Sequence, residues 1–434
     1  LKYQGVGHVG LMCLIYRPNS TTESIMVLSE KAKYYVDLEH RYGAHNYHPL
    51  EVVLSRGQGA YVWDVDGKRY FDFLSAYSAV NQGHCHPKII AALKEQAEKI
   101  CLTSRAFYND CLGEYEEFMH HYFGYDKMLP MNSGAEAVET ALKLSRRWGY
   151  RVKGIPEEKA VIIVCDGNFH GRTISIVSMS SDPDSYTDYG PYTPGFVNIP
   201  YNNIEALENA LEEHKDHVAA FVVEPIQGEA GVFVPDDGYI RRAAELCRKY
   251  HALFVADEVQ TGIARTGRML CCDHDDVRPD IVVLGKAISG GVLPVSCVLA
   301  DDEVMLTIKP GEHGSTFGGF PLACKVAMAA LTVVKEERLP ERAEELGQYF
   351  RGELLKIKSP LLKLVRGRGM LNAIVIEPHN GHEAWDVCEA MAERGLLAKP
   401  THRHIIRLAP PLCITREELA QAVEIIKESI KVLE

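Results

Sequence analysis

The sequence lacks long hydrophobic runs and lacks an excess of basic residues. Its apolar stretches stay short, as in the six residues from Val218 to Val223, whereas a membrane-spanning helix needs about 20 apolar residues. Across 434 residues, 47 Lys and Arg stand against 59 Asp and Glu, which gives a net charge of −12. An acidic chain has no electrostatic attraction for nucleic acid or anionic lipid. We therefore expect neither membrane insertion nor a nucleic-acid partner.

Regular cysteine spacing is also missing. The twelve cysteines are scattered along the chain and include the adjacent pair Cys271-Cys272. This distribution favours free thiols in a reducing compartment over a disulfide scaffold. The N-terminal stretch lacks the Arg-rich, Ser-rich pattern of a transit peptide, so we expect a cytoplasmic protein, with the mitochondrial matrix as the alternative.

The common nucleotide-binding and metal-binding motifs are absent as well. No G-x-x-x-x-G-K-[ST] loop occurs, and no strand runs into G-x-G-x-x-G. The segment His84-Cys85-His86 has metal-ligand residue types but no second His/Cys pair at a usual distance. We therefore expect no metal, and any bound phosphate need not belong to a nucleotide.

What the chain does contain is an alternation of short apolar runs with longer helix-period stretches. This pattern is typical of an α/β fold with a mainly parallel, buried sheet. The clearest strands are 161–164, 219–223, 253–256 and 281–284, and the clearest helices are 136–150, 203–214 and 239–250.

The two ends of the chain differ from this pattern and predict a smaller α+β domain. Helices are expected at 322–337, 343–357 and 416–433, with a strand at 370–376 and an early hairpin around Asp66-Gly67. We predict an N-terminal arm (1–34), a first part of the small domain (35–85), a large domain (86–335) and a C-terminal small domain (336–434).

Charged side chains follow two of the predicted strands directly. The strand 253–256 runs into Asp257-Glu258, and the strand 281–284 runs into Gly285-Lys286. Ligands of open α/β sheets bind outside the carboxyl ends of the strands. Desolvation lowers the pKa of a lysine and makes it a nucleophile toward carbonyls. Each residue alone could equally be solvated or paired, but together they predict a reactive site.

A third element is a helix start suited to an anion. Ser133 is the expected N-cap, with Glu136 in capping-box register. The small residues Gly134 and Ala135 let an anion approach the free amides, and the helix dipole adds about 0.3–2 kcal/mol. A phosphorylated carbonyl cofactor bound through the lysine fits these three elements.

Together with further motifs, these elements resemble the class III aminotransferases, which depend on pyridoxal phosphate (PLP), and within that family the ornithine δ-aminotransferases. The spacing of Asp257 and Lys286 matches the family signature. The resemblance covers about residue 35 to the C-terminus and also rests on the segments 42–47, 81–87, 223–231 and 311–316. It implies the fold-type I architecture, with a large domain built on a seven-stranded sheet.

The resemblance also implies cofactor roles for particular residues. Lys286 would bind PLP covalently and move the substrate proton, and Asp257 would keep the pyridine nitrogen protonated. The remaining contacts would come from Gln260 to the ring oxygen, from Phe169 stacking on the ring, from Ser133, Gly134 and Ala135 to the phosphate, and from Thr316 of the neighbouring subunit. The expected partner is therefore a second copy of the chain, in a homodimer with shared active sites.

For the substrates, the family implies ornithine and 2-oxoglutarate, and a place in proline and arginine metabolism. Arg172 would bind the α-carboxylate of ornithine and Tyr47 its α-amino end. Arg407 would bind the carboxylate of 2-oxoglutarate next to the reacting carbonyl, and Glu229 would pair with this arginine while ornithine is bound. Tyr77 is a further pocket residue.

Two alternatives stay open. The chain could act on N-acetylornithine or 4-aminobutyrate with the same cofactor residues, or it could be a catalytically silent binding subunit. Three positions depart from the family pattern: Phe320 stands where Asn is common, and Phe317 and His170 stand where related proteins carry Tyr and Trp. The last two could retune the pocket.

Overall fold

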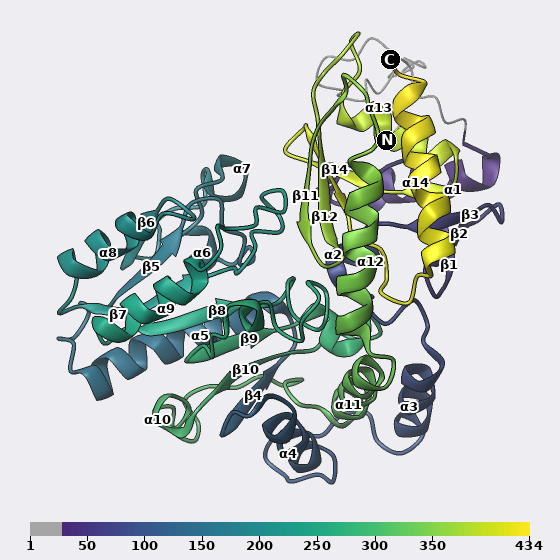
Figure 1. The fold of residues 1–434 in the computed structure, drawn as a ribbon. Coiled ribbons are helices and arrows are strands. Elements are labelled where there is room, and N and C mark those ends of the chain that lie inside the picture. The colour runs from purple at the N-terminus through teal and green to yellow at the C-terminus, as the bar shows by residue number, and fades with distance from the viewer. Residues whose placement is uncertain (1–27) are drawn as a thin grey trace, which may run out of the picture.

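The computed structural model describes residues 28–434 (Figure 1). Most of the N-terminal arm expected over residues 1–34 lies outside the described residues. The α-helices are α1 (Glu30–Tyr42), α2 (Ser75–Ser78), α3 (Pro87–Ala97), α4 (Leu112–Phe123), α5 (Gly134–Trp148), α6 (Ile174–Val177), α7 (Pro183–Tyr186), α8 (Ile204–Glu213), α9 (Tyr239–Lys249), α10 (Asp302–Met305), α11 (Pro321–Glu336), α12 (Leu339–Leu354), α13 (Ala384–Glu393) and α14 (Arg416–Lys431). The strands are β1 (Leu54–Gln58), β2 (Tyr61–Asp64), β3 (Arg69–Asp72), β4 (Lys127–Met131), β5 (Val161–Cys165), β6 (Phe196–Ile199), β7 (Val218–Val223), β8 (Leu253–Asp257), β9 (Ile281–Leu284), β10 (Ser296–Ala300), β11 (Leu362–Arg368), β12 (Leu371–Ile376), β13 (Leu396–Leu397), β14 (Lys399–Thr401) and β15 (Ile405–Leu408).

The large part of the molecule is built on a seven-stranded sheet in the order β4-β10-β9-β8-β7-β5-β6. The pairs from β9 through to β6 are all parallel, and only β10 runs antiparallel to its two neighbours, β4 and β9. The predicted fold class, with its mainly parallel seven-stranded sheet, is confirmed.

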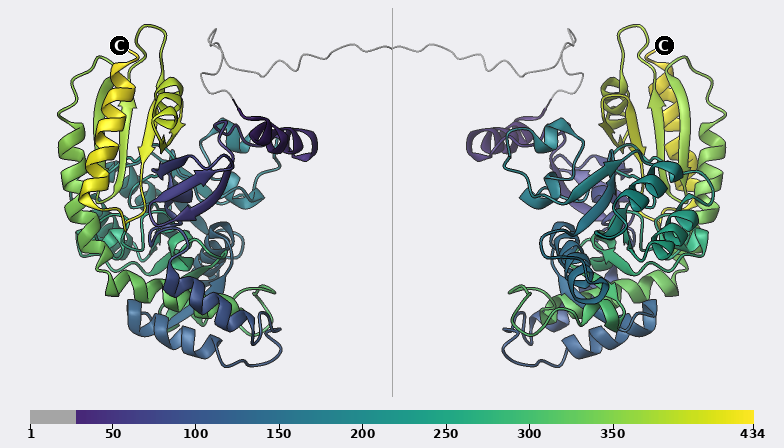
Figure 2. Two further views of the ribbon diagram at one scale, coloured as in Figure 1. Left: turned by 90° about the vertical axis from the view of Figure 1, so that its right-hand side faces the viewer. Right: turned by 90° about the vertical axis from the view of Figure 1, so that its left-hand side faces the viewer.

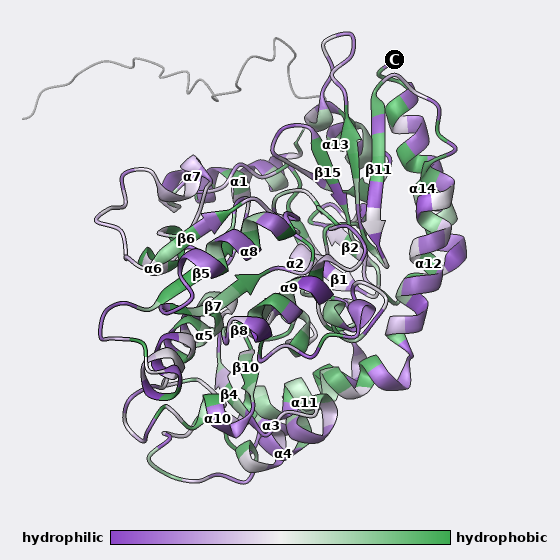
Figure 3. Cartoon of the chain, turned by 60° about the vertical axis from the view of Figure 1, so that its left-hand side comes forward, coloured by the Kyte–Doolittle hydropathy of each residue, from purple (hydrophilic) through white to green (hydrophobic). Residues whose placement is uncertain are grey.

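Helices cover both faces of this sheet. Every residue of β7 is buried, as expected for a strand packed on both sides. On one face, alternate residues of the central strands form a core with α5; on the other face, the remaining residues pack against α8 and α9. In Figure 3 the strand β7 is coloured white to green, in keeping with its apolar sequence. Each fully buried Val, Leu, Ile or Phe side chain contributes roughly 1.5–3 kcal/mol.

The helix α5 begins where its capping signal predicts. The Ser133 side chain accepts a hydrogen bond from the Glu136 amide, and the Glu136 carboxylate accepts one from the Ser133 amide, which forms a capping box. The helix therefore begins at Gly134, as the Ser133 N-cap predicts and two residues before the helix-period range 136–150. It continues beyond Trp148 as a π-helix over Gly149–Lys153.

Two four-stranded sheets form the upper part of Figure 1, in the orders β1-β2-β3-β13 and β11-β12-β15-β14. The predicted hairpin is present as β2 and β3, and β3 pairs in parallel with β13 near the other end of the chain. The hairpin thus joins the C-terminal elements, as the sequence analysis expects. The helices α12 and α14 run side by side over the second sheet (Figure 1). The division into domains at particular residues stays a prediction.

Candidate functional site

Four neighbouring parallel strands end at the same edge of the large sheet. In the order β9-β8-β7-β5, these strands lead directly into Lys286, Asp257, Glu224 and the segment 168–170. The helix α5 begins at this edge too, because it follows β4, which runs in the same direction as β9. Residues more than 100 positions apart in the sequence are thereby brought together, at the edge where open α/β sheets bind ligands.

Lys286 has the features of a reactive amine. It is half-buried, and its ammonium has no hydrogen-bond partner among the described residues. Burial lowers the pKa of Lys286 to about 8; the charge of Glu229 opposes this shift and that of Arg407 adds to it. The backbone of Lys286 is left-handed, with φ 47°, which costs a non-glycine residue roughly 1–2 kcal/mol. The fold thus stabilises the neutral, nucleophilic form in a strained position.

Asp257 is fixed on both of its oxygens. Its Oδ1 accepts a hydrogen bond from the Val259 amide at 3.1 Å, and its Oδ2 lies 2.6 Å from Nδ1 of His170. The His170 side chain is fully buried, and its Nε2 has no partner. Burial by itself would lower the pKa of His170, but the hydrogen bond and charge of Asp257 outweigh it, so the pKa is raised. An imidazole thus orients the carboxylate from one side.

Glu224 completes this buried group. Its Oε2 accepts a hydrogen bond from the Phe169 amide at 3.0 Å, and burial raises its pKa to about 7. No local pattern predicts the contact of His170 with Asp257, and Glu224 was part of the family motif 223–231 without a role of its own. Glu224 could have been found by the rule that found Asp257 and Lys286, because it also directly follows an apolar strand.

The start of α5 has free backbone amides, as an anion site requires. No hydrogen-bond acceptor for the amides of Gly134 and Ala135 lies among residues 28–434. A Cβ atom on Gly134 would lie 3.0 Å from Cγ1 of Val259, so a side chain there would crowd the approach to these amides. The nearby Asn132 has a buried Oδ1 without a partner. Free amides and a helix N-terminus together favour a bound phosphate.

Gln260 and Phe169, the residues expected to contact the cofactor ring, have distinct surroundings. A Cβ atom on Gly228 would lie 1.9 Å from Oε1 of Gln260, so only glycine leaves room for this side chain. Phe169 is half-buried and has the guanidinium of Arg172 5.5 Å from its ring centroid. An unpaired lysine, an oriented carboxylate and an anion cradle at one sheet edge fit PLP, which carries an aldehyde, a ring nitrogen and a phosphate.

Arg407 and Glu229 form the predicted ion pair. Nη1 of Arg407 lies 2.7 Å from Oε2 of Glu229, and Nη2 lies 3.2 Å from Oε1. The arginine side chain is 6% exposed and that of the glutamate 31% exposed. The arginine also lies over the ring of Tyr77, 4.8 Å from its centroid, and its Nε is buried without a partner. The Arg407 guanidinium is therefore already paired with a carboxylate of the same chain.

Tyr77 is carried by an unusual turn. The four residues of α2, Ser75 to Ser78, all have positive φ between 46° and 70°, although none is glycine. Burial raises the pKa of Tyr77, and among the charges that act on it are those of Arg407, Glu229 and Tyr47. Tyr47 itself is 70% exposed in the single chain.

Two predicted site residues lie open to solvent in a single chain. Arg172 is exposed, and its Nη1 makes a hydrogen bond of 3.4 Å with Oγ of Ser185. Thr316 is exposed as well, while the adjacent Ser315 accepts a hydrogen bond from Asn132 of the same chain at 2.8 Å. Their roles in binding stay predictions.

The histidines near residue 85 have ordinary partners. His84 contacts Asp72 at 2.7 Å, and His86 contacts Glu337 at 2.8 Å. Among residues 28–434, no group of three or more His, Cys, Asp or Glu could hold a metal ion. Over the same residues, no helix has both the length and the apolar character needed to cross a membrane.

Comparisons with known proteins agree with this geometry. Residues 42–430 match the family Aminotransferase class-III. The mitochondrial ornithine aminotransferase of Rattus norvegicus is 60% identical over 399 residues, which are 92% of this chain and 90% of the relative. A structure of the Toxoplasma gondii ornithine aminotransferase, crystallized with oxidized glutathione and showing partial occupancy of PLP at its active site, is 50% identical with a TM-score of 0.90 and covers 93% of this chain and 94% of its own. An acetylornithine aminotransferase structure from Elizabethkingia anophelis is 58% identical with a TM-score of 0.85 and covers 92% and 99%. The chain belongs to the class-III aminotransferase family.

Proposed function

We propose that this protein uses PLP to transfer the δ-amino group of L-ornithine to 2-oxoglutarate, which gives glutamate 5-semialdehyde and glutamate. The observation that carries the proposal is the closed pair of Arg407 and Glu229 in the surroundings of Lys286. A free arginine at this place would bind the α-carboxylate of ornithine and present the wrong amine for reaction. Because Glu229 pairs with Arg407, ornithine enters the site with its distal amine toward Lys286.

When bound, PLP supplies an electron sink for the pair of electrons that remains after the substrate carbon loses its proton. Lys286 would hold the cofactor through Nζ and, once released, would move the proton between the substrate carbon and the cofactor. Asp257, held by His170, keeps a proton on the ring nitrogen. The contacts of Gln260 to the ring oxygen and of Phe169 to the ring face orient the cofactor.

The phosphate is bound by Ser133, Gly134 and Ala135 at the start of α5. The free amides of Gly134 and Ala135 and the helix dipole support this role. Thr316 of the partner subunit closes the phosphate site, so each active site combines residues of two chains.

For ornithine, Arg172 binds the α-carboxylate and Tyr47 the α-amino group. A guanidinium binds a carboxylate by two parallel hydrogen bonds, and the exposure of Arg172 in the single chain leaves it free to do so. In the second half-reaction, 2-oxoglutarate places a carboxylate on Arg407, and Glu229 moves aside. Tyr77, whose ring faces the guanidinium of Arg407, is a further residue of this substrate site.

The active form is a homodimer. In the single chain, α1 buries only Ala32 and extends away from the body of the molecule (Figure 2). Large apolar side chains such as Phe107 at 74% and Phe317 at 47% exposure support a covered interface.

For the compartment, the mitochondrial location named for the rat relative supports the matrix, while the cytoplasm is the location that the sequence favours. Fractionation of cells that express the full gene decides between the two compartments.

The test compares kcat/KM for ornithine, N-acetylornithine and 4-aminobutyrate with 2-oxoglutarate as acceptor. Wild type should prefer ornithine, because acetylation removes the charged amine that Tyr47 binds, and a hydrogen bond to a charged group contributes about 1.5–3 kcal/mol. Arg172→Lys should weaken ornithine use more than glutamate use. The matched control is Arg241→Lys, because Arg241 is an exposed arginine on α9 that is paired with Asp276.

The 58% identity to an acetylornithine aminotransferase makes N-acetylornithine the donor to exclude. If it equals or beats ornithine in the wild type, the ornithine assignment fails. Tyr47→Phe should lower the ratio of kcat/KM for ornithine to kcat/KM for N-acetylornithine. An unchanged ratio would show that Tyr47 does not bind the substrate.

A further inference from the structure

A second cation lies next to Arg407 in the small domain. The strand β14 is the edge of its sheet, and Lys399 on this strand is directly opposite Arg407 on β15. In an antiparallel pair, residues directly opposite each other project to the same face, with Cβ atoms about 4.5–5.5 Å apart. Lys399 and Arg407 therefore extend from the same face of the sheet.

Two like charges in this position destabilise a sheet unless an anion lies between or beside them. Lys399 is half-buried, and its ammonium has no hydrogen-bond partner or ion pair in the described part of the chain. Burial lowers the pKa of Lys399, and the charge of Arg407 lowers it further, whereas Glu229 raises it. Glu229 is the carboxylate that acts on both cations.

The strand β14 also holds the backbone of Glu229. Oγ1 of Thr401 donates a hydrogen bond of 3.0 Å to the Glu229 carbonyl. Thr401 lies two residues beyond Lys399 and so on the same face of the strand. Glu229 is thus tied by its backbone to β14 and by its carboxylate to Arg407 on β15, and Lys399 extends from the same face of β14 as Thr401.

We propose that Lys399 is a positioning residue that receives the carboxylate of Glu229 when a substrate carboxylate takes its place on Arg407. The proposal rests on the proposed function, in which one half-reaction brings a carboxylate to Arg407 and the other does not. With ornithine, two cations face one carboxylate of the chain. With 2-oxoglutarate or glutamate, Arg407 pairs with the substrate carboxylate and Lys399 pairs with Glu229.

This arrangement explains why Glu229 can leave Arg407 at little cost. Glu229 is 31% exposed, so water replaces only part of the lost ion pair. A carboxylate that leaves a buried arginine without a new cation would lose charge-assisted hydrogen bonds. With Lys399 beside it, the carboxylate changes partner, and the dicarboxylate half-reaction depends on this lysine while the ornithine half-reaction does not.

The test removes the charge and keeps the shape. Lys399→Met should raise KM for 2-oxoglutarate and Kd for glutarate about three- to tenfold. The single-turnover rate and KM with ornithine should stay within about twofold of wild type. Lys399→Arg should restore both dicarboxylate values. Glutarate has neither an amine nor a keto group, so its binding, followed by titration calorimetry, reports on the site without turnover.

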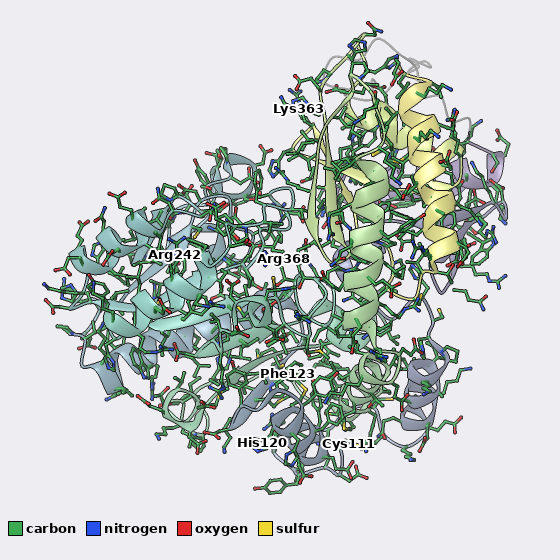
Figure 4. The ribbon with its side chains drawn as sticks, viewed as in Figure 1. Cys111, His120, Phe123, Arg242, Lys363 and Arg368 are labelled. Atoms are coloured by element: carbon green, nitrogen blue, oxygen red, sulfur yellow. The ribbon has the colours of Figure 1, made fainter. Side chains whose placement is uncertain are left out.

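Lys363→Met is the matched control, since Lys363 is an exposed lysine of β11 in the same sheet, paired with Glu377 and labelled in Figure 4. It should change none of these values. In the background of Glu229→Gln, Lys399→Met should lose its effect on glutarate, because the neutral amide needs no cation.

An unchanged Kd for glutarate in Lys399→Met overturns the proposal, as does an equal loss for ornithine and glutarate, which would indicate a structural role. An undiminished effect in the Glu229→Gln background also overturns it. Failure of the proposed function is distinguishable, because it would be seen as the lack of ornithine turnover in the wild type, whereas the effect of Lys399 and Glu229 on glutarate binding is measured without turnover.

Discussion

Nδ1 of His170 lies 2.6 Å from Oδ2 of Asp257, and neither side chain is more than 5% exposed. Because the carboxylate accepts, the nitrogen that faces it must carry the proton. The same Asp257 also accepts a hydrogen bond from the Val259 amide. His170, which departs from the family pattern, thus sets the orientation of the Asp257 carboxylate, the group assigned to the cofactor ring.

We predict that His170 acts on the rate of proton removal through Asp257. His170→Phe keeps an aromatic ring but removes the donor, and hydrogen bonds to charged groups contribute about 1.5–3 kcal/mol, so the rate with ornithine should fall about tenfold to a hundredfold. His170→Asn keeps an N–H near the position of Nδ1 and should retain most of the rate. Single-turnover absorbance measurements with ornithine check both.

The comparison with Asp257→Ala separates a positioning role from a packing role. Removal of the carboxylate should slow the reaction more than His170→Phe does, while PLP stays bound. If His170→Phe and His170→Asn slow the reaction equally, the hydrogen bond is not the cause and the ring matters only for its volume.

A second prediction concerns pH. Burial lowers the pKa of Lys286 to about 8, so the amine is protonated and unreactive below that pH and neutral above it. The rate at which PLP-free protein binds PLP covalently should therefore rise with pH, with a midpoint near 8 rather than near the 10.5 of an ordinary lysine. Stopped-flow absorbance over pH 6.5 to 9.5 measures it.

Lys153 provides an internal control for this prediction. Burial also lowers its pKa to about 8, but its ammonium donates hydrogen bonds to the carbonyls of Val218 and Tyr250 at 2.7 and 3.1 Å. A satisfied ammonium far from the phosphate cradle should not react. Borohydride reduction and mass mapping should find the pyridoxyl group on Lys286 alone, and its presence on another lysine would contradict the aminotransferase site.

A third prediction concerns stability. Arg265 is fully buried and donates hydrogen bonds to Oδ1 of Asn81 and to the carbonyls of Met370 and Pro410, at 2.7 to 3.2 Å. Arg265→Met leaves three buried acceptors without donors, so the free energy of unfolding should fall by about 3 kcal/mol or more.

The matched control is Arg241→Met, which removes an exposed arginine paired with Asp276. Its unfolding free energy should change by less than about 1 kcal/mol. Denaturant unfolding at saturating PLP measures both variants. Equal stabilities of the two would show that the carbonyls near Arg265 find other donors.

The sequence predicted those parts of the site that depend on one strand or one helix start. Asp257 and Lys286 each interrupt an apolar run, and Ser133 with Glu136 is a local capping signal, so no tertiary information is needed to find them. The strand bounds were correct to within a residue for the same reason, since a strand buried on both faces is apolar throughout.

Other features depend on pairings that no local pattern encodes. The positions of Lys399 and Arg407 opposite each other follow from the register of β14 and β15. The left-handed turn that carries Tyr77 contains no glycine to signal it, because the surrounding fold imposes it. The contact of His170 with Asp257 joins two strand ends 87 residues apart.

The last prediction concerns the interface. Thr316 is exposed in the single chain, next to Phe317 with an exposed fraction of 47%, and the proposed function assigns it to the phosphate site of the other subunit. Neither a Lys286→Ala chain nor a Thr316→Trp chain should be active by itself. In a mixed dimer, one site combines the intact Lys286 of the second chain with the intact threonine of the first. Random mixing at equal amounts makes about half of the dimers mixed, and each mixed dimer has one intact site of two. Activity should therefore return to about a quarter of wild type. Activity is measured after subunit exchange, which fluorescence transfer between differently labelled chains verifies. A mixture that exchanges subunits and stays inactive would show that each site is built within one chain.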